Sequence, residues 1–168
     1  MITTTTTMNN FEHTFEEYTQ EYLPKKLEVF KSLMGKAFRV KDLFGKGQGE
    51  KSIIKKLGRL SDFKGVYAFI DDGEVIYVGT SEKVINRLSY HVKGYTKYQA
   101  HLAWELAKEN DLYLNKKNQT PNLEKAKSMI MNMKVLFMEV TSPVERHLLE
   151  IYSCMHFDCR FNFFETHR

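Results

Sequence analysis

Long hydrophobic runs are missing from this sequence, and none of its apolar stretches approaches the roughly 18 residues of a membrane-spanning helix. Cysteine is scarce as well: Cys154 and Cys159 are too few for a disulfide framework. The threonine-rich start, residues 1–10, lacks the basic and apolar regions of a secretory signal. We therefore expect a cytoplasmic protein with no membrane partner.

Neither sign of charge dominates the whole chain, whose 25 Lys and Arg and 21 Asp and Glu leave a net charge of +4. The basic residues are nevertheless concentrated, because residues 22–64 carry twelve of them against four acidic residues, a local net charge of +8. Such a segment suits a polyanion, and the alternative is an ordinary solvated helix face. The candidate nucleic-acid-binding residues in it are Lys51, Lys55, Lys56 and Arg59.

The length of 168 residues fits one domain, and the 42% of apolar residues supplies material for a core. We expect a disordered tail over 1–10 and a helical, basic extension over 11–64. An aromatic stripe at Phe11, Phe15, Tyr18 and Tyr22 predicts a helix that Pro24 ends. A second short helix, a possible short strand at 37–40 and a basic helix around 53–60 follow.

A hairpin is the clearest local prediction in the second part of the chain, 65–168. Two β-rich runs, 66–70 and 75–78, flank the turn sequence Asp71-Asp72-Gly73. A three-residue loop with a bulge at Gly73 would pair Tyr67 directly with Tyr77 and put both phenols on one face.

The elements after this hairpin are mostly helical. A helix after Thr80 or Ser81 should turn its apolar residues inward, and two more are predicted at about 98–114 and 121–132, with Pro121 in the first turn. Residues 134–140 read as a third strand. Ser142-Pro143-Val144-Glu145 has the arrangement of a capping box, and the helix that it starts should reach about 155. The inward residues expected for these helices are Val84, Ile85, Leu88 and Val92, and then Val144, Leu148, Ile151 and Met155.

At these residues the sequence resembles a known family. Gly65-Val66-Tyr67 and Tyr77-Val78-Gly79 are similar to the two signatures of the GIY-YIG nucleases. The similarity extends to Arg87, His91, Glu150 and Asn162 in the family's order, with an insertion over 93–133. It implies an α/β (α+β) fold in which a small three-stranded antiparallel sheet is flanked by helices, preceded here by the helical extension.

The resemblance also implies catalytic roles for Tyr67, Tyr77, Arg87, His91, Glu150 and Asn162. Tyr67 would be the base that activates water, with Tyr77 as its partner, although a phenol of ordinary pKa near 10 needs cationic neighbours to do so. Arg87 and His91 lie one helical turn apart, which predicts that both reach a single phosphate. Asn162 would support the site by hydrogen bonding.

The two glutamates of the last helix have different expected roles. Glu145 has a sufficient structural role as the third residue of the capping box. The family aligns Glu150 with its metal-binding carboxylate, and one carboxylate with waters and substrate phosphate suits Mg²⁺ or Mn²⁺. The structural alternative for Glu150 is an ion pair with Arg146.

Three positions depart from the family pattern. Thr80 stands where the excision-repair branch often has lysine, so a cation beside the phenols is missing, and Cys159 and Phe161 replace a proline and a tyrosine. Zinc binding by Cys154, His156 and Cys159 is disfavoured because a fourth ligand at regular spacing is lacking. Buried free cysteines are the preferred interpretation.

The sequence thus predicts a divalent-metal-dependent endonuclease that hydrolyses DNA by a single-metal mechanism, with RNA not excluded as a substrate. We expect a monomer or homodimer of the stand-alone or restriction type. The alternatives are a catalytically inactive nucleic-acid-binding module that retains the fold and an interaction domain whose similarity is accidental.

Overall fold

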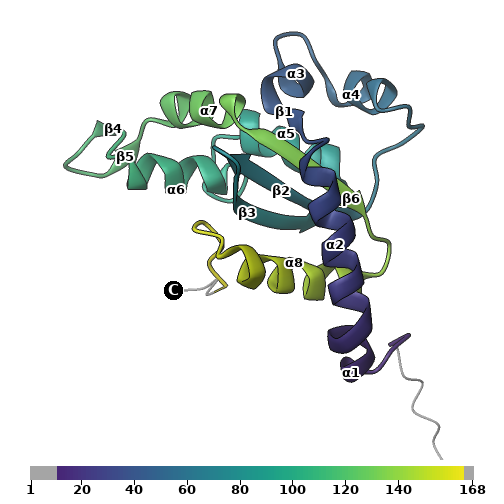
Figure 1. The fold of residues 1–168 in the computed structure, drawn as a ribbon. Helices are drawn as coiled ribbons and strands as arrows, with labels where there is room; N and C mark the ends of the chain where they lie inside the picture. Colours follow the sequence, from purple (N-terminus) through teal and green to yellow (C-terminus); the bar gives the residue numbers. More distant parts are fainter. Residues whose placement is uncertain (1–10, 165–168) are drawn as a thin grey trace, which may run out of the picture.

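The structure is a computed structural model that describes residues 11–164 (Figure 1). The tail predicted over 1–10 lies outside the described residues. Within 11–164, no helix combines the length and apolar character that crossing a membrane requires.

A four-stranded antiparallel sheet forms the centre of the fold, in the order β1-β6-β2-β3. Its strands are β1 (Phe38–Arg39), β2 (Gly65–Asp71), β3 (Glu74–Ser81) and β6 (Lys134–Glu139). The predicted α/β class with an antiparallel sheet is confirmed, but three strands was one too few. The short strand expected at 37–40 joins the sheet as β1, which pairs with β6 through Phe38 and Val135.

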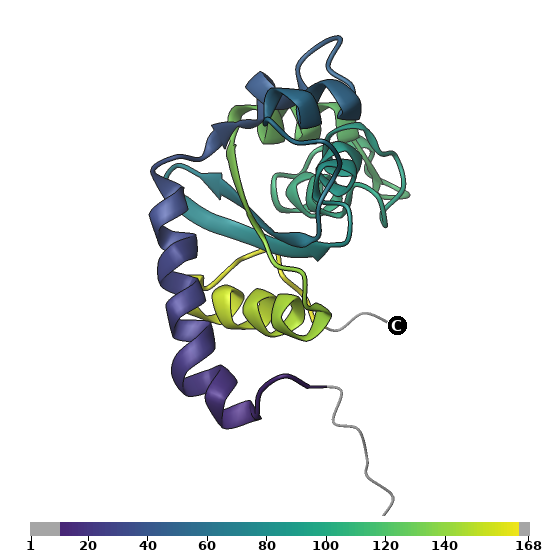
Figure 2. The ribbon, with the colours of Figure 1, turned by 90° about the vertical axis from the view of Figure 1, so that its right-hand side faces the viewer.

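Helices cover both faces of this sheet, so β2 is buried on its two sides (Figure 2). One face packs under α2 (Leu23–Met34) and α8 (Pro143–Phe157). The other face packs under a larger layer. That layer contains α3 (Val40–Phe44), α4 (Glu50–Lys56), α5 (Val84–Lys93), α6 (His101–Glu109) and α7 (Leu123–Asn132).

The N-terminal helix does not end at Pro24. Residues 15–34 form one continuous helical run, composed of α1 (Phe15–Glu17), a π-helical turn η1 (Tyr18–Tyr22) and α2. The amide of Leu23 bonds to the carbonyl of Tyr18, five residues back, and the proline takes the first turn of α2, where its missing N–H is least costly. The predicted break is therefore wrong, and Phe11 precedes the helix.

The hairpin contains the expected bulge at a different place. Asp72 and Gly73, both with positive φ, form a two-residue turn, and the register then shifts between Phe69 and Ile70. Phe69 consequently lies opposite Tyr77, and Tyr67 lies opposite Gly79. Direct pairing of Tyr67 with Tyr77 is wrong, but the bulge still puts the two phenols on the same face.

The insertion over 93–133 folds into α6, the small β4 (Tyr113–Asn115) and β5 (Thr120–Pro121) pair, and α7. Pro121 belongs to β5 and not to a helix, because Asn122 caps α7 by accepting a bond from the amide of Lys125. The predicted inward residues of α5 are confirmed: all four are buried in the larger core.

The stripe predicted for α8 is wrong. Ile151 and Met155 are 42% and 77% exposed, while Leu149, Ser153 and Cys154 are buried instead. Leu149 and Cys154 belong to the core under the sheet, and Leu148 is partly buried against it. Val144 and Leu148 also line a cavity with the N-terminal segment 11–18. This orientation leaves Glu150 partly buried and outside both core clusters.

Candidate active site

Close packing in the hairpin accounts for both glycines of the two signatures. A Cβ atom at Gly79 would lie 2.5 Å from Cζ and Oη of Tyr67, whose ring lies over that residue. A Cβ atom at Gly65 would lie 2.3 Å from the carbonyl oxygen of Met138 on the neighbouring strand. Glycine therefore lets the tyrosine ring and β6 approach the hairpin backbone.

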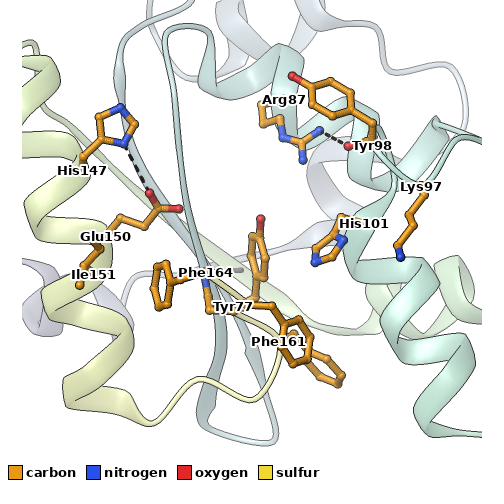
Figure 3. A pocket seen from close by; sticks show the side chains of 12 residues that line it. Tyr77, Arg87, Lys97, Tyr98, His101, His147, Glu150, Ile151, Phe161 and Phe164 are labelled. Carbon is orange, nitrogen blue, oxygen red and sulfur yellow. Dashed lines mark hydrogen bonds and ion pairs between the residues drawn. The ribbon is translucent and has the colours of Figure 1, made fainter. Parts of the chain in front are cut away.

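Side chains from three elements meet at a cavity of about 760 Å³ beside β3 (Figure 3). Tyr77 projects into it from β3, Arg87 from α5 and Glu150 from α8. In Figure 3 the phenol of Tyr77 lies between the carboxylate of Glu150 and the guanidinium of Arg87. The remaining lining residues are Lys97, Tyr98, His101, His147, Ile151, Phe161, Asn162, Phe163 and Phe164.

Asn162 holds the strand that carries Tyr77. Its side-chain oxygen accepts a bond from the amide of Val78 at 2.9 Å, and its side-chain nitrogen donates to the carbonyl of Val78 at 2.6 Å. The amide of Phe161 also donates to the carbonyl of Ile76 at 3.1 Å. The segment after α8 thus completes the hydrogen bonding of the edge strand β3 on both sides of Tyr77.

Tyr67 and His91 lie behind the cavity, not in it. Tyr67 is 1% exposed and His91 has no exposed surface, and a hydrogen bond of 2.9 Å joins Tyr67 Oη and His91 Nε2. Arg87 lines the cavity and His91 does not, and the shared phosphate contact of these two residues stays a prediction. The role of Tyr67 as a base stays a prediction, for its phenol contacts the imidazole and not the cavity.

Burial determines the protonation of this inner pair. It raises the pKa of the Tyr67 phenol well above its usual value, with the neighbouring Tyr77 adding to the shift and the charge of Arg87 opposing it. Burial also lowers the pKa of His91 far below its usual value, together with the charge of Arg87. Both groups are consequently neutral near pH 7, and they form a neutral hydrogen-bonded pair.

Glu150 is the carboxylate of the cavity, and its side chain is 21% exposed. Burial raises its pKa to about 7, with no basic group close enough to reverse the shift. Among residues 11–164, the basic side chain within 4 Å of this carboxylate is His147, whose Nδ1 lies 3.8 Å from it. The predicted alternative, a pair with Arg146, is wrong because that guanidinium donates to the carbonyls of Val140 and Thr141.

This environment fits a divalent cation. A carboxylate that desolvation destabilises gains from an adjacent positive charge, and its oxygen is a hard ligand of the type that Mg²⁺ prefers. The cavity beside it leaves space for the waters and phosphate oxygens that such a cation keeps.

The separate cluster of Glu12, His13 and Glu145 does not belong to this cavity. Their ligand atoms lie within 4.8 Å of one another at the start of α8. Glu145 accepts a hydrogen bond of 2.6 Å from the phenol of Tyr22, and its amide donates to Ser142 Oγ at 3.4 Å. Its predicted capping position is therefore observed, although its carboxylate bonds to Tyr22 of η1 and not to the cap.

Arg87 is the cationic group of the cavity on α5. One of its terminal nitrogens donates to the carbonyls of Tyr98 and Gln99 at 3.2 and 3.0 Å, which ties α5 to the segment before α6. The guanidinium also lies 5.7 Å from the ring of Tyr98. The arginine is thus held in place by the insertion.

Lys97 and His101 are functional candidates that sequence reasoning missed. They come from the insertion, whose role the motifs do not define, and they line the wall of the cavity opposite Glu150 (Figure 3). Lys97 supplies a cation to the cavity although Thr80 does not. A clue in the sequence is that the insertion starts directly after the helix with Arg87.

The four basic residues predicted to bind nucleic acid are outside the cavity lining. Lys51 and Lys55 are exposed on α4. Lys56 donates to the carbonyl of Asp42 at 2.7 Å, and Arg59 pairs with Glu139 at 2.9 Å while covering the ring of Phe63. Two of the four therefore also have structural contacts, and the nucleic-acid role of all four stays a prediction.

Cys154 and Cys159 are both free thiols near the end of α8, the first buried and the second partly buried. The amide of Cys159 donates to the carbonyl of Cys154 at 3.1 Å, closing the helix after Asp158 in the left-handed conformation. Both cysteines therefore belong to the structure that ends α8.

Neither a protein-family model nor a curated protein matches this sequence. Among solved structures, the chain is similar to the GIY-YIG N-terminal endonuclease domain of UvrC from Thermotoga maritima bound to its catalytic magnesium. The identity is 20%, the TM-score is 0.41, and the match covers 69% of this chain and 100% of that one. A point mutant of the same domain matches at 19% identity and a TM-score of 0.41, covering 69% and 99% of the two chains. This is the family that the motifs resemble.

Proposed function

We propose that this protein is a divalent-metal-dependent endonuclease that hydrolyses phosphodiester bonds of DNA. The observation that carries the proposal is the meeting of Arg87 and Glu150 around the phenol of Tyr77 in one cavity (Figure 3). Hydrolysis of a phosphodiester needs positive charge on the phosphate, an activated water and help for the leaving oxygen.

Glu150 is the residue that would hold Mg²⁺ or Mn²⁺. The bound cation supplies charge neutralisation at the phosphate and at the leaving oxygen. Arg87 contacts a non-bridging phosphate oxygen with the guanidinium nitrogens that its backbone contacts leave available, and stabilises the charge that develops there.

The two tyrosines have different positions relative to the reacting atoms in this proposal. Tyr77 meets the phosphate or the attacking water, because it is the phenol that lines the cavity. Tyr67 and His91 pack against it, with ring centroids 6.2 and 5.3 Å from that of Tyr77, and act as positioning residues. Asn162 positions the same phenol through the backbone of β3.

Substrate grip is proposed for the exposed lysines of α4, Lys51 and Lys55, and for the neighbouring Lys56 and Arg59. Contacts of this kind go to the phosphate backbone and carry no sequence information. The cavity itself has no feature that separates DNA from RNA, and the choice of DNA rests on the family that the motifs resemble.

Nicking of supercoiled plasmid tests the proposed function. The full chain should convert the plasmid to open-circular DNA with Mg²⁺ and not with EDTA, and E150A and R87A should each lose about two orders of magnitude or more in rate. Circular dichroism of the variants confirms that they fold. Cleavage by E150A at the rate of the unsubstituted protein would refute the proposal.

The second candidate, a nucleic-acid-binding module without catalysis, is supported by the burial of Tyr67 away from the cavity. It predicts salt-dependent DNA binding with no nicking under any divalent cation. If the protein neither binds nor nicks DNA, the remaining alternative is an interaction domain.

A further inference from the structure

We infer that His101, on the insertion, is the proton acceptor for the attacking water in the cavity. This inference rests on the proposed function and assigns a step in it that the motif residues leave open. The phenol of Tyr67 faces the imidazole of His91 and is sealed from the cavity. His101 lines the cavity and is the first residue of α6.

The position of His101 meets the geometric requirement of an in-line displacement. The attacking and leaving oxygens of such a reaction lie on opposite sides of phosphorus. In Figure 3, Glu150 and His101 lie on opposite sides of the Tyr77 phenol, with Arg87 beyond its hydroxyl. A phosphate held over Tyr77 by Arg87 would therefore have a carboxylate-bound cation on one side and an imidazole on the other.

The imidazole of His101 packs beside two aromatic rings, and its nitrogens make no hydrogen bond to the described residues. Its ring centroid is 6.4 Å from that of Tyr77 and 6.4 Å from that of Phe163, the latter edge to face. No hydrogen bond to a ring nitrogen of His101 occurs among residues 11–164. A nitrogen lone pair therefore remains for water.

The groups around His101 keep the imidazole neutral. Its pKa is lowered from its usual value, first by partial burial and then by the charges of Lys97 and Arg87, against the opposing charge of Glu105. The other titratable groups that face this region are Tyr77 from β3, His91 from α5, Tyr98 from the segment before α6, and Glu150 and His147 across the cavity. A neutral imidazole accepts a proton at neutral pH far more readily than phenols whose pKa burial has raised.

In the proposed step, water is the nucleophile and a sugar oxygen is the leaving group. A lone pair of the water oxygen forms the new bond to phosphorus while the proton of that water passes to a ring nitrogen of His101. The bond between phosphorus and the sugar oxygen breaks, and its electron pair leaves with that oxygen on the Glu150 side, where solvent reprotonates it. The imidazolium then releases its proton to solvent.

Single-turnover cleavage of a duplex DNA by H101Q tests this assignment. The cleavage rate should fall by about 10²–10⁴-fold, while DNA affinity measured in Ca²⁺ changes less than about threefold, which is under 1 kcal/mol. H156Q is the matched control, because His156 is exposed at the end of α8 and does not line the cavity. Cleavage by H101A should recover in part when imidazole is added.

A pH profile separates this role from a structural one. The rate of the unsubstituted protein should rise with pH through a pKa below the usual histidine value and then level, because the imidazole must be unprotonated. Glu150 must also ionise to hold the cation, so the part of the pH profile that reports Glu150 should shift with Mg²⁺ concentration. The part that reports His101 should not shift with Mg²⁺ concentration. The H101Q profile should lack the Mg²⁺-independent limb.

The outcomes distinguish the two proposals. Full cleavage by H101Q, or an H101Q profile that retains the Mg²⁺-independent limb, overturns the inference while a dead E150A variant leaves the proposed function standing. If E150A cleaves as well as the unsubstituted protein, the proposed function fails and this inference fails with it.

Discussion

Gly79 is the residue at which the hairpin sequence and the site constrain each other most directly. An alanine there would put its Cβ atom 2.5 Å from the ring of Tyr67. We predict that G79A lowers the free energy of unfolding by about 1–3 kcal/mol, the usual cost of overpacking. Denaturant unfolding measures it, with G35A as the control, since nothing lies within 4 Å of a Cβ atom at Gly35. Equal stability of G79A and the unsubstituted protein would contradict this packing.

Glu150 links charge to stability. Its pKa is raised to about 7 in the folded protein, so between the ordinary carboxyl pKa and about 7 the folded state holds a proton that the unfolded state has lost. Stability therefore falls as pH rises through this window, and the cost is fully present above it.

We predict that E150Q removes this cost, because a neutral amide needs no ionisation. In the absence of divalent cation, E150Q should exceed the unsubstituted protein in stability by about 1–3 kcal/mol at pH 8 and by little at pH 5. Thermal unfolding at the two pH values measures this, with E74Q, at the exposed first residue of β3, as the control. Mg²⁺ should raise the melting temperature of the unsubstituted protein but not that of E150Q. A pH-independent difference would contradict the assigned pKa.

Asn162 acts at the scale of a strand, since it bonds both backbone groups of Val78 on the edge of the sheet. We predict that N162A exposes this edge, lowers stability by about 1–2 kcal/mol and speeds hydrogen exchange at the Val78 amide. N162D, which keeps the acceptor and loses the donor, should fall between. N132A, on the exposed end of α7, is the control. Unchanged hydrogen exchange at the Val78 amide in N162A would contradict the assigned role of the two Asn162 hydrogen bonds.

Most elements of this fold are predictable from local sequence, and their exceptions have physical causes. Alternation and turn residues located β2, β3 and β6, and the inward face of α5 followed from its period. The break predicted at Pro24 is absent because a π-helical turn precedes the proline, which then lies in the first turn of α2. Ile151 and Met155 were predicted to be buried and are exposed. Apolar spacing identifies a hydrophobic stripe on a helix but not whether another element packs against that stripe.

The candidate site likewise contains residues that the sequence motifs predicted and residues that only the structure reveals. The motifs located Tyr77, Arg87, Glu150 and Asn162, each of which lines the cavity. Lys97 and His101 were beyond reach because their relevance arises from the insertion packing beside α5. Helical spacing puts His91 on the face of Arg87 but does not reveal that it is fully buried against the rings of Tyr67 and Tyr77.

In the whole molecule, the residues proposed to bind DNA and those proposed to cleave it lie on different elements. The exposed lysines are on α4, whereas the cavity lies beside β3. We predict that reversing Lys51 and Lys55 together weakens DNA binding and reduces the slope of log affinity against log salt by about 2. Lys56 stays intact in this variant because it contacts Asp42. K25E on α2, across the sheet, is the control. Unchanged affinity and slope would assign the α4 lysines to an ordinary solvated face.

We propose that Glu150 and Arg87 form a metal-dependent hydrolytic centre around Tyr77. Its most direct test is the rate of plasmid nicking by the full chain and by E150A, measured side by side with Mg²⁺ at equal protein concentration. Nicking by the unsubstituted protein should require Mg²⁺ and should be lost in a folded E150A variant. Equal nicking by the two proteins, or no nicking by either with any divalent cation, would contradict it.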